Sequence, residues 1–216
     1  MARESGNTQS FSRLLLLLAL TLLLVPMANA SILSAGDTMP PSPLFPTGTT
    51  LASISGVTLT TPTFSVVYST SVLRDPNNTW CANCLDFVYQ FTNNGPDVNQ
   101  RYTMYNFGDF MIAAGTMPFG VHDPTTVSRS ASTGGQVISF NFVGNEIPRG
   151  MTTVTLVIET NATLFEPGLV SVQDGTANFG NAFQPAIPEP TSLVLMGGGL
   201  IAAGGFLRRS RSGKKS

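Results

Sequence analysis

Cationic residues are scarce in the central part of the chain. Residues 31–190 contain no lysine and only four arginines against eleven acidic residues, a balance of −7. Nucleic-acid binding needs clustered Lys and Arg to neutralise phosphates, so this balance excludes such a partner for the region. Large apolar residues recur throughout the same region, which predicts one acidic folded domain and argues against disorder.

Side chains that commonly carry catalysis or bind metals are also scarce. His122 is the only histidine, and its Gly- and Pro-containing surroundings are typical of a loop. One histidine cannot supply a zinc triad, and a Ser-His-Asp site would need His122 with an unidentified serine. No H-E-x-x-H, G-x-S-x-G or P-loop pattern occurs. We therefore predict no catalytic, cofactor or metal site and a domain that is not an enzyme.

Three kinds of site stay open because their geometry depends on the fold. Two carboxylates for glycoside hydrolysis need only a suitable spatial separation. Calcium has candidate ligands in Asp109 and in Asp174 followed by Gly175, although no D-x-[DN]-x-[DN]-G loop is present. Asn77 and Asn161 each begin an N-glycosylation pattern, N-x-T.

The two cysteines, Cys81 and Cys84, occur in the sequence WCANC at 80–84, which superficially resembles the thioredoxin-type W-C-x-x-C. A redox site of that kind needs a helix N-terminus to lower the pKa of the first thiol. Here a turn at 75–78 precedes the pair, and an alternating strand pattern begins at Leu85. We predict a structural disulfide that fixes a hairpin turn, with a redox site as the alternative.

The N-terminus has the three parts of a signal peptide. Arg3 and Arg13 precede an apolar run at 14–25, which Pro26 ends, and Ala-Asn-Ala at 28–30 supplies an A-x-A cleavage site. A buried helix would show a polar face at the 3.6-residue period, and this run shows none. Signal peptidase is therefore expected to cut between Ala30 and Ser31.

The C-terminus combines a short motif, an apolar run and a basic tail. Pro188, Glu189 and Pro190 precede the uncharged, glycine-rich segment 191–207, whose seventeen residues would span roughly 25 Å as a helix. That length is short for a bilayer core of about 30 Å but workable for a transmembrane helix flanked by snorkelling arginines. The tail 208–216 holds this end in the cytoplasm and leaves the acidic domain outside; its basic residues are Arg208, Arg209, Arg211, Lys214 and Lys215. A GxxxG-type dimerising anchor is the alternative.

This three-part order resembles the PEP-CTERM sorting signal of exported bacterial proteins, over residues 188–216. The resemblance implies recognition by a membrane-embedded exosortase and processing near 188–190, often in bacteria that make exopolysaccharide or biofilm matrix. In one departure from the pattern, serines interrupt the arginines and lysines follow them. The resemblance implies nothing about the fold or activity of residues 31–187.

The central region has the period-two alternation of strands. Residues 31–49 contain four prolines and are predicted to be an extended linker or an edge-lying arm. Strands are expected within 63–73, 85–92, 138–142 and 153–158 and at 170–172, and 47 of the 160 residues from 31 to 190 are Ser, Thr or Asn, which disfavours helices. Seven to nine strands predict a mainly β fold, an antiparallel β-sandwich over 50–187, with a jelly roll or a partly closed barrel as variants.

The alternation also assigns side chains to faces. The polar residues that alternate with large apolar residues along these strands are expected to face water: Asp86, Gln90, Ser139, Asn141 and Thr155. The predicted core contains Phe64, Val66, Tyr68, Phe87, Tyr89, Phe91, Phe140, Phe142, Leu156 and Ile158.

Together these features predict an exported protein, transiently anchored with its domain outside the cytoplasm and then sorted to the surface or released. Its partners are signal peptidase, an exosortase and extracellular polysaccharide, and its β-sandwich is a non-catalytic surface or matrix module. The alternative is a secreted glycoside hydrolase or lyase that acts on matrix polysaccharide.

Overall fold

The computed structural model describes residues 31–117, 121–132 and 134–187, and every regular element within them is a β-strand. The twelve strands are β1 Thr38–Met39, β2 Ser42–Pro43, β3 Thr49–Thr60, β4 Ser65–Asp75, β5 Cys84–Asn93, β6 Arg101–Met104, β7 Ile112–Thr116, β8 Thr126–Arg129, β9 Ile138–Asn141, β10 Leu156–Thr160, β11 Phe165–Asp174 and β12 Thr176–Pro185. The predicted mainly β class is confirmed. The predicted signal and transmembrane helices lie outside the described residues.

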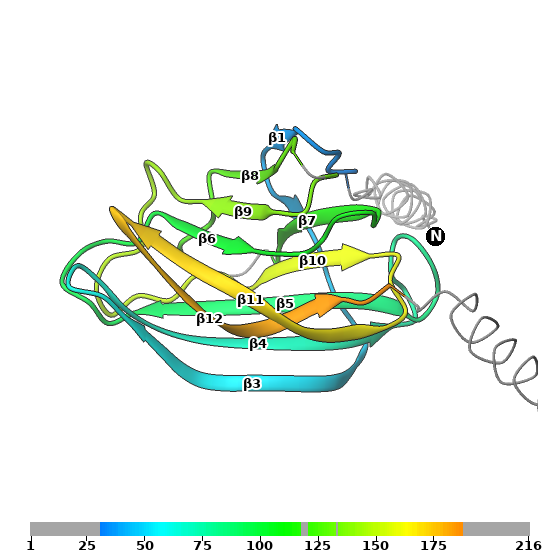
Figure 1. The fold of residues 1–216 in the computed structure, drawn as a ribbon, viewed down its shortest axis with the longest axis horizontal. Helices are drawn as coiled ribbons and strands as arrows, with labels where there is room; N and C mark the ends of the chain where they lie inside the picture. The colour runs from blue at the N-terminus through cyan, green and yellow to red at the C-terminus, as the bar shows by residue number, and fades with distance from the viewer. Residues whose placement is uncertain (1–30, 118–120, 133, 188–216) are drawn as a thin grey trace, which may run out of the picture. The chain divides into compact units, whose positions relative to one another are not determined.

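The strands form two six-stranded sheets (Figure 1). Sheet A has the order β2-β7-β10-β5-β4-β3, and sheet B has the order β1-β8-β9-β6-β11-β12. Strand β12, orange in Figure 1, contacts β3, β4 and β5 of the other sheet. Pairing between the named strands is antiparallel, as predicted, except that β2 of the N-terminal arm pairs with β7 in parallel.

The Pro-rich segment is an edge-lying arm, one of the two expected alternatives. Its strand β1 pairs with β8 at the border of sheet B, and β2 pairs with β7 at the border of sheet A. Leu33 is buried in the core, and Leu44 is buried after β2. One short segment therefore adds a border strand to both sheets.

The core lies between the two sheets, and the prediction of its members is confirmed. All ten predicted core side chains are at most 1% exposed. Phe91 of sheet A stacks on Tyr102 of sheet B with 4.0 Å between ring centroids. Two tyrosine hydroxyls of sheet A donate to backbone oxygens of β12: Tyr68 to Asn181 at 2.7 Å and Tyr89 to Phe183 at 3.2 Å. Apolar burial and these polar contacts join the sheets.

The prediction that five polar strand residues face water is wrong for three of them. Gln90 is exposed and Thr155 is partly exposed, but Asp86, Ser139 and Asn141 are buried. These three side chains do point away from the core, as predicted. They are buried because other parts of the chain cover the outer faces of the sheets. The β4–β5 hairpin contacts Asp86, while Ser139 and Asn141 lie within hydrogen-bonded rows of side chains on sheet B.

Candidate functional site

The outer face of sheet B carries a straight row of hydroxyl side chains. Cross-strand pairing places one such residue from each of five neighbouring strands side by side. The row is Thr38, Ser128, Ser139, Thr103 and Ser171. The Thr103 and Ser139 hydroxyl oxygens are 3.1 Å apart, so these two neighbours in the row hydrogen-bond to each other. Neighbouring strands lie about 4.8 Å apart, which gives the row a regular spacing.

A second row runs parallel to the first on the same face of sheet B, displaced by two residues in each strand. It consists of Thr126, Asn141, Arg101 and Gln173. Arg101 Nε donates to Asn141 Oδ1 at 2.6 Å, and Asn141 Nδ2 donates to the hydroxyls of Thr126 at 3.2 Å and Ser128 at 3.3 Å. Asn141 therefore connects the two rows and fixes the orientation of the Arg101 guanidinium.

Two aromatic side chains lie at the β12 end of the hydroxyl row. Phe179 pairs with Ser171 in the register and is 54% exposed. The Tyr105 ring lies 5.9 Å from the Phe179 ring, and its hydroxyl is 3.0 Å from Ser171 Oγ. We call the two rows with Tyr105 and Phe179 the sheet-B platform. It combines an apolar stacking surface with hydrogen-bonding groups, as sites for polar ligands do.

Two hollows adjoin the platform, and Arg101 and Val143 line both. The larger one, of about 440 Å³, is lined by Thr38, Arg101, Thr125, Thr126, Ser128, Asn141 and Val143. The smaller one, of about 170 Å³, also contains Gln100, Gln173, Asp174 and Gly175. Burial, with the charge of Asp97, raises the pKa of Asp174. The two hollows thus differ in charge, because only the smaller one contains a carboxyl group.

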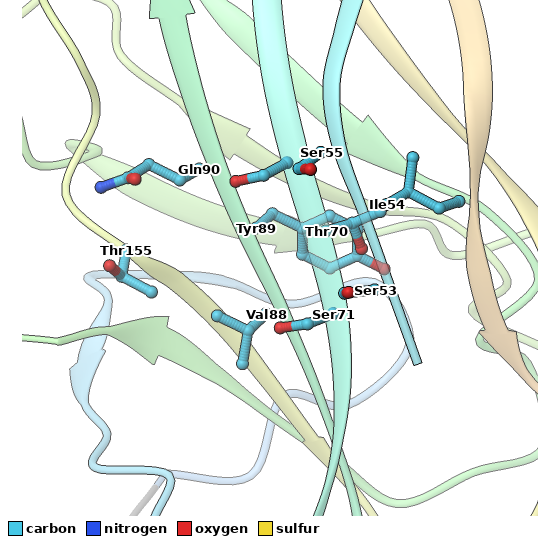
Figure 2. A pocket seen from close by; sticks show the side chains of 10 residues that line it. Ser53, Ile54, Ser55, Thr70, Ser71, Val88, Tyr89, Gln90 and Thr155 are labelled. Carbon is cyan, nitrogen blue, oxygen red and sulfur yellow. The ribbon is translucent and has the colours of Figure 1, made fainter. Parts of the chain in front are cut away.

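A third hollow, of about 280 Å³, lies on sheet A (Figure 2). Small hydroxyl side chains from β3 and β4 dominate it, with Val88, Tyr89 and Gln90 from β5 and Thr155, which directly precedes β10. Tyr89 is 1% exposed, so its ring is not a stacking surface for a ligand. No residue lining this hollow carries a formal charge at neutral pH.

The hairpin between β4 and β5 contains the two cysteines, which are joined by a disulfide. Its Asn78 side chain donates to Asp86 Oδ1 at 2.7 Å and to the Thr160 backbone oxygen at 3.2 Å, and Trp80 Nε1 donates to the Glu159 backbone oxygen at 3.3 Å. The hairpin is therefore hydrogen-bonded to β5 and β10. Cys84 is the first residue of strand β5, so no helix follows the pair.

Three carboxyl groups lie beside this hairpin, and all are at most 5% exposed: Asp75, Asp86 and Glu159. Burial, a hydrogen bond with Asp75 and the negative charges of Glu159 and Asp75 raise the pKa of Asp86 to about 8, although Asn78 opposes the shift. Burial alone would raise the pKa of Asp75, but hydrogen bonds from Thr47, Asn77 and Asp86 lower it. The pKa of Asp86 is thus raised and that of Asp75 lowered, as in an acid and base pair, but both side chains are buried.

The remaining candidates from the sequence are His122, Asp109, Asp174, Asn77 and Asn161. His122 is half-buried, and its backbone oxygen accepts from the Val154 N–H. Asp109 is exposed, while Asp174 lies in the smaller hollow of sheet B. Within the described residues no group of three or more His, Cys, Asp and Glu side chains could hold a metal ion. Asn77 and Asn161 are both exposed.

The residues predicted to direct export and sorting lie mostly outside the described part of the chain. Ser31 is the first described residue and is exposed. Ala30, the motif 188–190, the segment 191–207 and the basic tail 208–216 are not described. Among described residues no helix has the length and apolar character to cross a membrane.

Comparison with known protein families identifies the C-terminal segment. Residues 186–211 match the family model of the PEP-CTERM protein-sorting motif. The chain carries a PEP-CTERM sorting motif. This motif implies an exported protein that an exosortase-type membrane protease processes and that is sorted to the surface. Searches of curated proteins and of solved structures returned no match.

The PEP-CTERM motif and the platform differ in how far the sequence predicts them. The motif is a contiguous pattern, and its prediction is confirmed. The sequence does not predict the platform, and it predicts Asn141 to face water, because the platform residues come from separate strands and meet only through the register. The sequence signal that could have found it is the Ser, Thr and Asn content of one strand parity.

Proposed function

We propose that this chain is a non-catalytic surface or matrix protein whose β-sandwich binds extracellular polysaccharide through the sheet-B platform, in association with exopolysaccharide or biofilm. The observation that carries the proposal is the combination of a PEP-CTERM motif with the sheet-B platform, in which Thr38, Arg101 and Phe179 are exposed while most of the hydroxyl row is buried. Sugars offer hydroxyl groups for hydrogen bonds and apolar ring faces for stacking on aromatic side chains.

In this proposal the chain is divided into four parts. Residues 1–30 are a signal peptide, 31–49 an arm, 50–187 the exported sandwich and 188–216 the sorting signal with its transmembrane segment 191–207. Signal peptidase cuts before Ser31, and the exosortase cuts near 188–190. Mass spectrometry of protein recovered from an exosortase-containing host tests both cuts. A mature chain that begins at Met1, or that retains residues 195–215, contradicts the corresponding half of the proposal.

The burial of the clustered carboxyl groups supports a non-catalytic domain over a glycoside hydrolase or lyase. A glycoside hydrolase needs two carboxyl groups that reach the sugar from opposite sides. Asp75, Asp86 and Glu159 lie beside the disulfide hairpin at 1%, 0% and 5% exposure, so a sugar ring has no access to them. The hollow on sheet A and the larger hollow on sheet B are lined by no carboxyl group.

A glycan array with matched phenylalanine variants tests polysaccharide binding. Phe179 belongs to the platform, whereas Phe45, which is 53% exposed, follows β2 in the N-terminal arm and serves as the control. We expect Phe179→Ala to lower glycan affinity about tenfold, as loss of a stacking contact does, and Phe45→Ala to leave it unchanged. Absence of binding to any glycan, equal loss in both variants or turnover of a bound polysaccharide would contradict the proposal.

A further inference from the structure

The four arginines between residues 31 and 187 are placed very differently. Arg129 is buried, and its guanidinium donates to four backbone oxygens. Arg74 and Arg149 are exposed and line none of the three hollows described above. Arg101 alone of the four lines the platform, where it borders both hollows.

The guanidinium of Arg101 is held in place and still has unused donors. Its Nε donates to Asn141, whose own amide is held by Thr126 and Ser128. Among the described residues neither terminal nitrogen of Arg101 has a hydrogen-bond partner or an ion-pair partner. A fixed guanidinium loses little conformational freedom when it binds a planar anion, and its charge makes the hydrogen bonds stronger.

Most of the side chains that line the larger hollow can donate hydrogen bonds. Besides Arg101 it contains four hydroxyl side chains and no carboxyl group. The hydroxyls of Thr126 and Ser128 accept from the Asn141 amide, which leaves their own hydrogens free to donate. Thr125 differs, because its hydroxyl donates to the Asn141 backbone oxygen. An anion in this hollow would meet the guanidinium and at least two hydroxyl donors.

Neither the smaller hollow nor the overall charge of the domain favours the binding of an anion. Asp174 gives the smaller hollow a carboxyl group that would repel an anion. The domain is acidic overall, with four arginines against ten acidic residues between 31 and 187, so its long-range field does not attract polyanions. Selective binding of an anion must therefore come from local contacts in the larger hollow.

We propose that the larger hollow beside Arg101 binds an anionic substituent of a saccharide, a carboxylate or a sulfate ester, and that the platform therefore selects acidic over neutral polysaccharide. The inference rests on the proposed polysaccharide binding and specifies its ligand class. The anionic group contacts Arg101, Thr126 and Ser128, while the rest of the saccharide extends across the platform toward Tyr105 and the exposed Phe179 ring.

Binding of the purified mature protein to three polymers tests the inference. Polygalacturonate presents carboxylates, dextran sulfate presents sulfate esters, and dextran is neutral. We expect at least one acidic polymer to bind about tenfold more tightly than dextran, the ratio that one charge-assisted hydrogen bond provides. Arg101→Gln should remove this preference, and Ser128→Ala should reduce it severalfold. Arg74→Gln is the matched control with the same change in charge, and thermal melts check that each variant is folded.

The outcomes separate this inference from the proposed function. Equal affinity for all three polymers, lowered by Phe179→Ala, overturns the selectivity and leaves polysaccharide binding intact. A preference for acidic polymers that Arg74→Gln removes as effectively as Arg101→Gln also overturns it, because the effect is then one of net charge. No binding to any polymer overturns the proposed function itself. If Arg101→Gln does not fold, an unchanged preference in Ser128→Ala decides against the hollow.

Discussion

Asn78 in the β4–β5 hairpin donates a 2.7 Å hydrogen bond to Asp86 on the outer face of sheet A. The Asn78 Oδ1 atom accepts from the Trp80 N–H at 2.8 Å, so the orientation of this amide is fixed. The second oxygen of Asp86, Oδ2, is buried and receives no hydrogen bond from the described residues. Burial and the hydrogen bond with Asp75 therefore favour the protonated form of Asp86.

The pKa of Asp86, about 8, predicts that stability falls as pH rises from 5 to 9. Over this range the folded chain keeps a proton that the unfolded chain has lost, since an ordinary Asp has a pKa of about 4. The slope should approach about 1.4 kcal/mol per pH unit below pH 8 and level off above it. The lowered pKa of Asp75 acts only below about pH 4, where its contribution to stability is lost.

Thermal melts of Asp86→Asn test this pH dependence, because an amide stays neutral throughout. The variant should melt at nearly the same temperature at pH 6 and pH 8, whereas the unmodified protein should melt lower at pH 8. Asp123→Asn, which alters an exposed carboxyl group, should keep the original slope. Identical slopes in Asp86→Asn and the unmodified protein would rule out the buried proton.

The disulfide between Cys81 and Cys84 is predicted to be structural and redox-inert. It closes a loop of four residues, so the double variant Cys81→Ser, Cys84→Ser should lose only about 2 kcal/mol in the free energy of unfolding. No helix dipole activates Cys81, because strand β5 begins at Cys84. The protein should not catalyse insulin reduction by dithiothreitol; catalysis abolished by Cys81→Ser would show a redox site.

The Arg129 guanidinium is predicted to be a main support of the loops around it. It is 7% exposed and donates to the backbone oxygens of Leu33, Phe107, Phe110 and Gly135 at 2.8–3.0 Å. Lysine cannot reach four acceptors in this planar arrangement, so Arg129→Lys should lower the free energy of unfolding by about 2–4 kcal/mol. Arg74→Lys at an exposed site should change it by less than about 0.5 kcal/mol in the same urea titration.

Strand register gives a fourth prediction. Phe140 is fully buried, and Phe140→Ala should cost about 3–5 kcal/mol through lost burial and a cavity. Gln90 lies on the exposed parity of β5, and Gln90→Ala should stay within about 0.5 kcal/mol. Asn141 is unsuitable as the neutral control, because its side chain hydrogen-bonds to Arg101, Thr126 and Ser128. Equally mild effects in the Phe140 and Gln90 variants would refute the assignment of faces.

The period-two alternation of apolar and polar residues predicted the core, because the large apolar residues of each strand all point to the side of the sheet that faces the other sheet. It predicted β5 well, where the pattern is nearly uninterrupted from Leu85 to Phe91. It missed β3, because register shifts between Thr50 and Ala52 and between Ile54 and Val57 interrupt the alternation. It also missed β7, whose residues are all buried, so that no polar parity marks the strand.

The errors at the surface have a different cause. Parity tells which side of a sheet a residue faces, but not what covers that side. Asp86 is buried because a hairpin eight residues earlier contacts it, and Asn141 because Arg101, forty residues earlier, hydrogen-bonds to it. Such contacts depend on loop conformation and on long-range pairing, which a single sequence does not encode in any local pattern.

The junction between the folded domain and the sorting motif leaves almost no tether. Strand β12 ends at Pro185, the Ala186 N–H donates to the Leu164 oxygen at 2.9 Å, and the matched motif begins at residue 186. Only two residues lie between Pro185 and Pro188, a reach of about 10 Å at most. A chain processed at 188–190 would thus keep only a few residues beyond the end of strand β12.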